Sequence, residues 1–150
     1  MSQSLAKVYV HAIFSTKNRE PCLAESWREE LFNVLGGSVN GIGCQSLIMG
    51  GVADHIHGLF ALARTITLAD AIGKIKMTSS LWINQTRGLI SPFHWQAGYG
   101  AFSVSQSNVE AVREYIRGQA EHHKKQSFQD ELREWLDRYQ IKRDEKYMWD

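Results

Sequence analysis

The hydrophobic and polar positions of the chain alternate with a period of two in some stretches and with a helical period in others. Runs rich in β-branched and aromatic residues, bounded by polar or glycine-rich turns, predict strands over residues 5–15, 45–51, 55–62 and 98–105. Apolar residues at helical spacing predict helices over residues 24–35, 68–85, 108–125 and 128–139. Thr67 and Ser127 stand at the N-cap positions of the second and fourth of these helices.

The order of these elements predicts the fold class. Only a short turn separates the second and third predicted strands, so these two form an antiparallel hairpin. The whole order predicts an α+β fold, a ferredoxin-like antiparallel sheet with helices mainly on one face. A C-terminal tyrosine-bearing helix and the helix after it are additions to that core. The length of 150 residues fits a single domain, 1–150.

Composition excludes several classes of protein. The chain is 43% hydrophobic and 22% charged, which is ordinary for a globular protein. No apolar run approaches the roughly 20 residues of a membrane span, and residues 1–14 do not resemble a signal peptide, so we expect a cytoplasmic protein without membrane contact. Cys22 and Cys44 are too few for a disulfide framework. Because the net charge is only +1, any nucleic-acid partner must meet a local basic surface.

A pair of histidines, His55 and His57, lies within the third predicted strand. Side chains alternate across a strand, so both imidazoles point to one face while Ile56 points to the core on the other. Two neutral imidazoles this close can bind one divalent metal ion. The same spacing also fits two solvated or hydrogen-bonded histidines that hold no ligand. A third ligand and a nucleophile are needed to decide between these interpretations.

The helix predicted over residues 108–125 carries a phenol, an amide and an imidazole along one strip. Gln119 lies four residues and His122 seven residues after Tyr115, which places all three on the same side of the helix. A phenol can attack phosphorus when a metal polarises the phosphate, and an amide oxygen is a suitable uncharged metal ligand. The pattern therefore fits a His-His-Gln metal site beside a tyrosine nucleophile. It also fits a core tyrosine with a surface glutamine.

The basic cluster His122–Lys125 stands at the end of the same helix. Cations are favoured at a helix C-terminus, so a solvated helix end explains the cluster. Contact with a nucleic-acid backbone explains it as well. A zinc site formed by His55 and His57 with His122 or His123 is a further alternative, although it lacks a fourth ligand and leaves Gln119 unexplained.

Five segments occur together in a specific order. They are VYVHAIFSTKNREP, GGVADHIHGLF, KIKMTSSLWIN, FHWQAGYGAFSVS and VREYIRGQAEHHKKQSFQDEL. Taken as a set, and above all through HIH followed by YIxxQ, the chain resembles the single-tyrosine HUH transposases of small bacterial insertion sequences, the insertion-sequence-two-hundred-like transposases. The resemblance extends from about Val8 to Trp149 and agrees with the predicted fold.

The resemblance implies a role for each chemical position. His55 and His57 would be metal ligands, Tyr115 the nucleophile, and Gln119 a third ligand supplied by the tyrosine helix. The metal would be Mg²⁺ or Mn²⁺. The reaction would cut and rejoin single-stranded DNA at the ends of an insertion sequence through a 5′-phosphotyrosine bond. Members of the family form dimers in which one subunit's tyrosine helix completes the other subunit's metal site, so a homodimer is expected; the residues alone do not predict that exchange.

Single-stranded DNA with hairpins is the partner that the resemblance implies. The candidate backbone contacts come from the first loop, the second predicted helix and the basic cluster: Lys17, Arg19, Lys74, Lys76, His122 and Lys124. A plain solvated role fits each of these side chains as well.

Two other functions stay open on the sequence. One is a domesticated relative that binds hairpin DNA or RNA without transposition, and the other is an unrelated ferredoxin-like binding or metal-sensing domain. A covalent protein–DNA adduct separates the enzyme from the unrelated domain. Inverted hairpin sequences that flank the gene separate it from the domesticated relative.

Overall fold

The computed structural model describes residues 2–150 and centres on a four-stranded antiparallel sheet. Its strands are β1 (Tyr9–Ser15), β2 (Gln45–Gly51), β3 (His55–Ala61) and β4 (Gly100–Val104). They lie in the order β2-β3-β1-β4, and every neighbouring pair is antiparallel. The predicted α+β class with a ferredoxin-like antiparallel sheet is confirmed.

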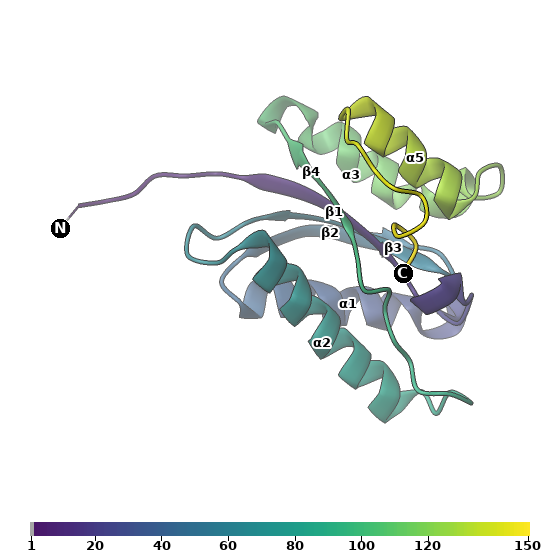
Figure 1. Ribbon diagram of the computed structural model, residues 1–150. Helices are drawn as coiled ribbons and strands as arrows, with labels where there is room; N and C mark the ends of the chain where they lie inside the picture. Colours follow the sequence, from purple (N-terminus) through teal and green to yellow (C-terminus); the bar gives the residue numbers. More distant parts are fainter. Residues whose placement is uncertain (1) are drawn as a thin grey trace.

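Helices cover both faces of the sheet (Figure 1). The two long helices, α1 (Glu25–Gly41) and α2 (Leu68–Thr86), lie together on one face, as the ferredoxin-like pattern predicts. The opposite face carries α3 (Val109–Arg117), α4 (Gln119–His122) and α5 (Phe128–Arg138). Two short 3₁₀ turns, η1 (Lys17–Arg19) and η2 (Gln106–Asn108), follow β1 and β4.

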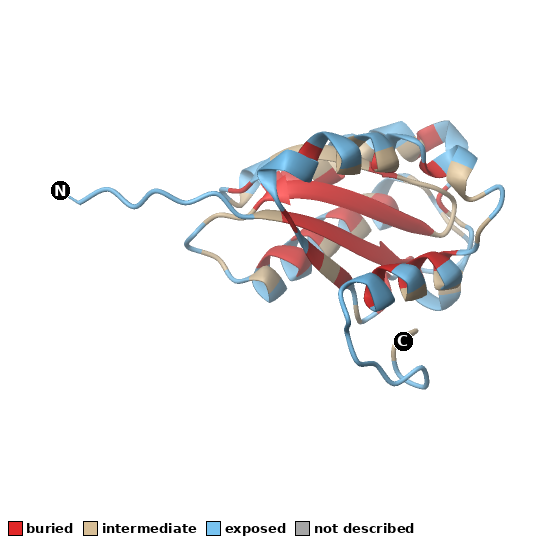
Figure 2. Ribbon diagram, turned by 90° about the horizontal axis from the view of Figure 1, so that it is seen from above, coloured by how far each residue is buried: buried red, intermediate tan, exposed pale blue. Residues whose placement is uncertain are grey.

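The central strands are buried on both sides, and their alternation divides the interior into two layers (Figure 2). In β1, Val10 and Phe14 join the apolar cluster under α1 and α2. Ile13 points the other way, into a cluster with the apolar residues of α5. In β3, Ile56 belongs to the first layer, so its histidine neighbours in the sequence face the second layer, under the C-terminal helices.

Two helix boundaries differ from the sequence prediction. The first helix, expected to end near residue 35, continues through Gly36 and Gly37 to Gly41. A Cβ atom on Gly36 would lie 3.3 Å from Ser46 Oγ, so a glycine there lets α1 pass close to β2. The tyrosine helix, expected to be continuous from residue 108 to 125, is interrupted at Gly118, which separates α3 from α4.

Among residues 2–150, no helix is both long enough and apolar enough to cross a bilayer.

Candidate metal centre and tyrosine site

His55 and His57 are fully buried on the face of β3 that α3, α4 and α5 cover. Each ring is held through its Nδ1 atom. His55 Nδ1 lies 2.6 Å from Asp54 Oδ1, and His57 Nδ1 lies 2.8 Å from His11 Nε2. Both rings therefore present Nε2 to the same place, and the predicted convergence of the two imidazoles agrees with the structure.

The short helix α4 brings two further side chains to this place. Gln119 is buried, and its Oε1 atom lies 3.3 Å from His55 Nε2. His123, which follows α4, places its Nε2 atom 3.1 Å from the same nitrogen. Of the two histidines weighed for a zinc site, His123 thus joins the pair from β3. The ring of His122 instead turns towards Tyr115, whose hydroxyl oxygen is 3.3 Å from its Nε2 atom.

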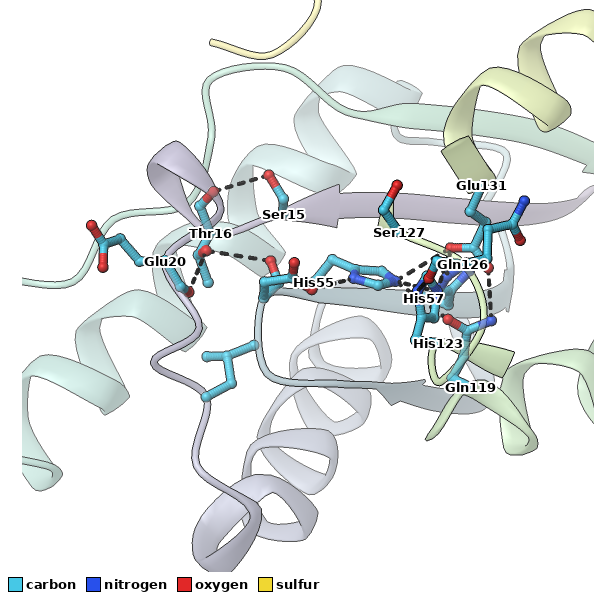
Figure 3. Close-up of polar contacts among 12 residues, drawn as sticks. Ser15, Thr16, Glu20, His55, His57, Gln119, His123, Gln126, Ser127 and Glu131 are labelled. Carbon is cyan, nitrogen blue, oxygen red and sulfur yellow. Dashed lines mark hydrogen bonds and ion pairs between the residues drawn. The ribbon is translucent and has the colours of Figure 1, made fainter. Parts of the chain in front are cut away.

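Glu131 of α5 stands at the centre of the cluster and was not among the residues predicted from the sequence (Figure 3). The carboxylate is 1% exposed. Its Oε1 atom lies 2.9 Å from His57 Nε2, 3.0 Å from His123 Nε2 and 3.3 Å from His55 Nε2. One signal could have revealed it, because residue 131 falls within the apolar stripe of its helix, between Phe128 and Leu132, where a carboxylate needs partners.

Tyr115 is hydrogen-bonded to the same carboxylate. Its hydroxyl group donates a hydrogen bond to Glu131 Oε2, which also accepts one from Gln119 Nε2 at 3.0 Å. The indole N–H of Trp135 donates to the Tyr115 oxygen at 3.3 Å. The phenol borders an open cleft of about 950 Å³ between α3, α4 and α5. One chain therefore holds the tyrosine beside its own histidines.

The electrostatics of the cluster follow from burial and from its hydrogen bonds. Burial lowers the pKa of His57 to about 4, so this imidazole is neutral near pH 7. Burial raises the pKa of Glu131, but hydrogen bonds with three histidines outweigh it and hold that pKa well below its usual range. Burial and the adjacent carboxylate both raise the pKa of Tyr115. The site thus combines a neutral imidazole, a carboxylate and a protonated phenol.

The donor atoms fit a divalent metal ion. His55, His57, His123 and Glu131 each offer one ligand atom, and these four atoms lie within 4.8 Å of one another. Atoms bound to one small divalent ion at about 2.1 Å lie roughly 3 Å apart in octahedral geometry. The contacts of Glu131 Oε1 with the three imidazoles, 2.9–3.3 Å, match that spacing. The group could therefore bind a metal.

The basic residues predicted to contact DNA are spread over the surface. Lys17 and Lys74 are exposed, and Lys124 is exposed and paired with Glu121 at 2.8 Å. Arg19 stacks over Trp149, with 5.8 Å between the guanidinium carbon and the ring centroid.

Lys76, another residue predicted to contact DNA, turns inward instead. Its ammonium group donates hydrogen bonds to the carbonyl oxygens of Gln96 at 2.8 Å and Gly98 at 2.6 Å. In this structure the Lys76 ammonium group therefore makes its hydrogen bonds within the chain.

Comparison with known proteins agrees with this fold. A protein from Deinococcus radiodurans R1, described as a candidate transposase, is 20% identical, with a TM-score of 0.63 over 79% of this chain and 98% of its own. A REP-associated tyrosine transposase, solved bound to a REP hairpin, is 15% identical, with a TM-score of 0.60 over 82% of this chain and 74% of its own. At these identities the likeness supports the fold alone. No curated protein matches the chain. The model of the family "Transposase IS200 like" matches residues 4–119, most of the sequence and both histidines of β3, and the chain therefore belongs to this family.

Proposed function

We propose that the protein is a metal-dependent strand transferase that cleaves and rejoins single-stranded DNA at insertion-sequence ends, with Tyr115 as its nucleophile. One observation carries the proposal: in a member of a transposase family, the Tyr115 hydroxyl is held against the carboxylate that contacts both histidines of β3.

In the proposed reaction the Tyr115 oxygen attacks a phosphodiester of the DNA. A bond forms between that oxygen and the phosphorus, and the bond from phosphorus to the 3′ oxygen breaks. The 3′ oxygen leaves with the electron pair and takes up a proton, while the phenol loses its own. A second 3′-hydroxyl then attacks the 5′-phosphotyrosine bond and releases Tyr115. The covalent bond conserves the energy of the phosphodiester, so ATP is not required.

The family implies Mg²⁺ or Mn²⁺, which His55 and His57 would hold together with the amide oxygen of Gln119. When bound, the ion neutralises charge that develops on the phosphate oxygens. The chain's own groups orient the reacting atoms. Trp135 donates a hydrogen bond to the Tyr115 oxygen, and Glu131 accepts one from its hydroxyl. Because these two partners restrict the phenol, little conformational freedom is lost when the phosphodiester arrives.

The proposed substrate is single-stranded DNA that folds into hairpins. The structural neighbour solved with a REP hairpin supports this choice. The proposed contacts with the DNA backbone are Lys17, Arg19 and Lys74, together with His122 and Lys124 near the tyrosine. Lys76 would have to leave its carbonyl partners to take part.

A homodimer would bring two DNA ends together. Since one chain already places Tyr115 beside its own histidines, the proposal has the tyrosine act in cis.

The test is an adduct assay. Purified protein is incubated with Mg²⁺ or Mn²⁺ and with single-stranded oligonucleotides copied from the flanks of its own gene. We expect a slowly migrating protein–DNA species on a denaturing gel, lost in Tyr115→Phe, in His57→Ala and with EDTA. Tyr147→Phe is the matched control, because Tyr147 is an exposed tyrosine that does not belong to the cluster around Tyr115, and it should leave the adduct intact.

An adduct that survives in Tyr115→Phe would contradict the proposal. Tight hairpin binding without any adduct, on flanks that carry inverted hairpin sequences, would instead favour the domesticated DNA- or RNA-binding protein.

A further inference from the structure

Two of the histidines at the centre of the site hold their Nδ1 atoms against acceptors outside it. His55 Nδ1 lies against the Asp54 carboxylate at 2.6 Å, and His123 Nδ1 lies against the Gln126 carbonyl oxygen at 2.6 Å. Both partners only accept, so Nδ1 carries a proton in each ring, and the neutral form of the ring presents an unprotonated Nε2 to the centre. Glu131 Oε1 meets these nitrogens at 3.3 and 3.0 Å. In that form the two nitrogens and the carboxylate oxygen converge as the ligands of one cation do.

We propose that His123 and Glu131 are metal ligands together with His55 and His57, so that three imidazoles and one carboxylate form the metal centre of this protein. They take the place of Gln119, the third ligand that the family resemblance implies, and Gln119 instead donates a hydrogen bond to Glu131. His123 and Glu131 both lie beyond residue 119, where the match to the family model ends. The segment after the tyrosine helix thus supplies half of this ligand set. The assignment rests on the proposed function for its place in the reaction, but the ligand set itself follows from the four converging atoms.

This ligand set determines which class of metal is bound. Mg²⁺ takes oxygen ligands and gives up its water molecules reluctantly. Imidazole-rich sites instead favour transition metals, and a carboxylate among the ligands is compatible with Mn²⁺. The centre therefore selects a first-row transition metal such as Mn²⁺ or Co²⁺ over Mg²⁺.

Glu131 also couples the metal centre to the nucleophile. Its Oε1 atom faces the three imidazoles, while its Oε2 atom accepts hydrogen bonds from the Tyr115 hydroxyl and from Gln119 Nε2. A carboxylate is rigid and planar, so an ion that fixes Oε1 restricts the positions that Oε2 can take. Glu131 is thus a positioning residue for Tyr115 as well as a ligand, and binding of the ion is expected to order the phenol.

The test measures metal binding in the full-length, EDTA-stripped protein. Titration calorimetry with Mn²⁺ and Mg²⁺ should give at least about tenfold tighter binding of Mn²⁺. Co²⁺ should produce a visible absorption band typical of nitrogen and oxygen ligands. Glu131→Gln, which keeps the shape of the side chain, should weaken Mn²⁺ binding by roughly tenfold or more and change the Co²⁺ band. Glu134→Gln, an exposed position three residues along α5, is the matched control and should change neither.

The coupling to Tyr115 has its own readout. In protein labelled with ¹³C at tyrosine Cζ, Mn²⁺ is replaced by diamagnetic Zn²⁺, and the Tyr115 resonance should shift on binding in the wild type but not in Glu131→Gln. Should Glu131→Gln fail to fold, His123→Ala, which alters a short and partly exposed segment, should still lower Mn²⁺ affinity.

Equal affinities for Mn²⁺ and Mg²⁺, or unchanged Mn²⁺ binding in both Glu131→Gln and His123→Ala, would overturn the ligand assignment. The adduct assay remains independent of this result. An adduct formed with Mg²⁺ by a protein that shows no preference for Mn²⁺ would leave the proposed function standing. Selective Mn²⁺ binding through Glu131 without any adduct would leave the ligand assignment standing and contradict the proposed function.

Discussion

His11 Nε2 lies 2.8 Å from His57 Nδ1, in a fully buried contact between β1 and β3. The antiparallel register pairs His57 with Ile13, which places His11 diagonally beside it on the same face of the sheet. If His57 binds a metal through Nε2, its proton sits on Nδ1 and is donated to His11. His11 is therefore the residue that orients His57, as the second partner of a metal-bound histidine does in many metal sites.

Removing this partner should weaken metal binding. The His11 ring packs against Trp135, with 4.7 Å between the ring centroids. His11→Phe keeps a ring at this position, but His57 Nδ1–H loses its acceptor. We expect Mn²⁺ affinity, measured by calorimetry, to fall by about 10- to 100-fold. His94→Phe alters an exposed histidine and serves as the control. Unchanged affinity in His11→Phe would mean that packing alone orients His57.

Gln119→Glu tests how close the amide lies to the carboxylate. Gln119 Nε2 donates to Glu131 Oε2 at 3.0 Å, so the substitution replaces an attraction by repulsion between two buried carboxylates. We expect a lower melting temperature without metal and a larger rise on adding Mn²⁺ than in the wild type, because the ion neutralises both charges. Gln85→Glu, at an exposed position of α2, should do neither. A metal-free melting temperature equal to that of the wild type would contradict the contact.

Gly50 determines how closely the tyrosine helix approaches the sheet. It pairs with His57 across β2 and β3, and a Cβ atom there would lie 2.8 Å from Ile116 Cγ2 and 2.9 Å from the Ile116 carbonyl oxygen. Because a backbone oxygen cannot rotate away, Gly50→Ala must displace α3, which carries Tyr115. We expect a loss of about 1–3 kcal/mol in the free energy of unfolding, measured by urea denaturation.

The control for this change is Gly37→Ala. Gly37 lies inside α1, and a Cβ atom added there would meet no other atom within 4 Å, so alanine should stabilise the helix by about 0.5–1 kcal/mol. Equal stability of Gly50→Ala and the wild type would show that α3 has room to move.

Lys76 should make stability depend on pH in the alkaline range. Burial lowers its pKa from 10.5 to about 8. The unfolded chain keeps this proton up to the ordinary value, so between the two pKa values the unfolded state binds more protons and stability rises with pH. We expect the difference in unfolding free energy between the wild type and Lys76→Met, measured by urea denaturation, to increase in favour of the wild type across this interval. A decrease would mean that its carbonyl partners stabilise the ammonium more than burial disfavours it.

Part of the site could be predicted because it depends on local periodicity. The period of two places His55 and His57 on one face of a strand wherever that strand lies in the sheet. The helical period likewise brings His122 to Tyr115, and the 3.3 Å contact between them survives the interruption at Gly118. The order of strands and helices similarly predicts the antiparallel sheet.

The other side chains that meet the two histidines come from elements distant in the sequence. Glu131 lies 74 residues from His57 and His11 lies 46 residues from it, and no local period relates such positions. Their contacts depend on how α5 packs over the sheet and on the register of β1 against β3. The strand, the helix and the faces on which the histidines and Tyr115 lie can be predicted from residue periodicity, because they follow from backbone geometry over a few residues. The carboxylate that joins them was decided by the packing of distant elements, which forms only when the apolar stripe of α5 is buried.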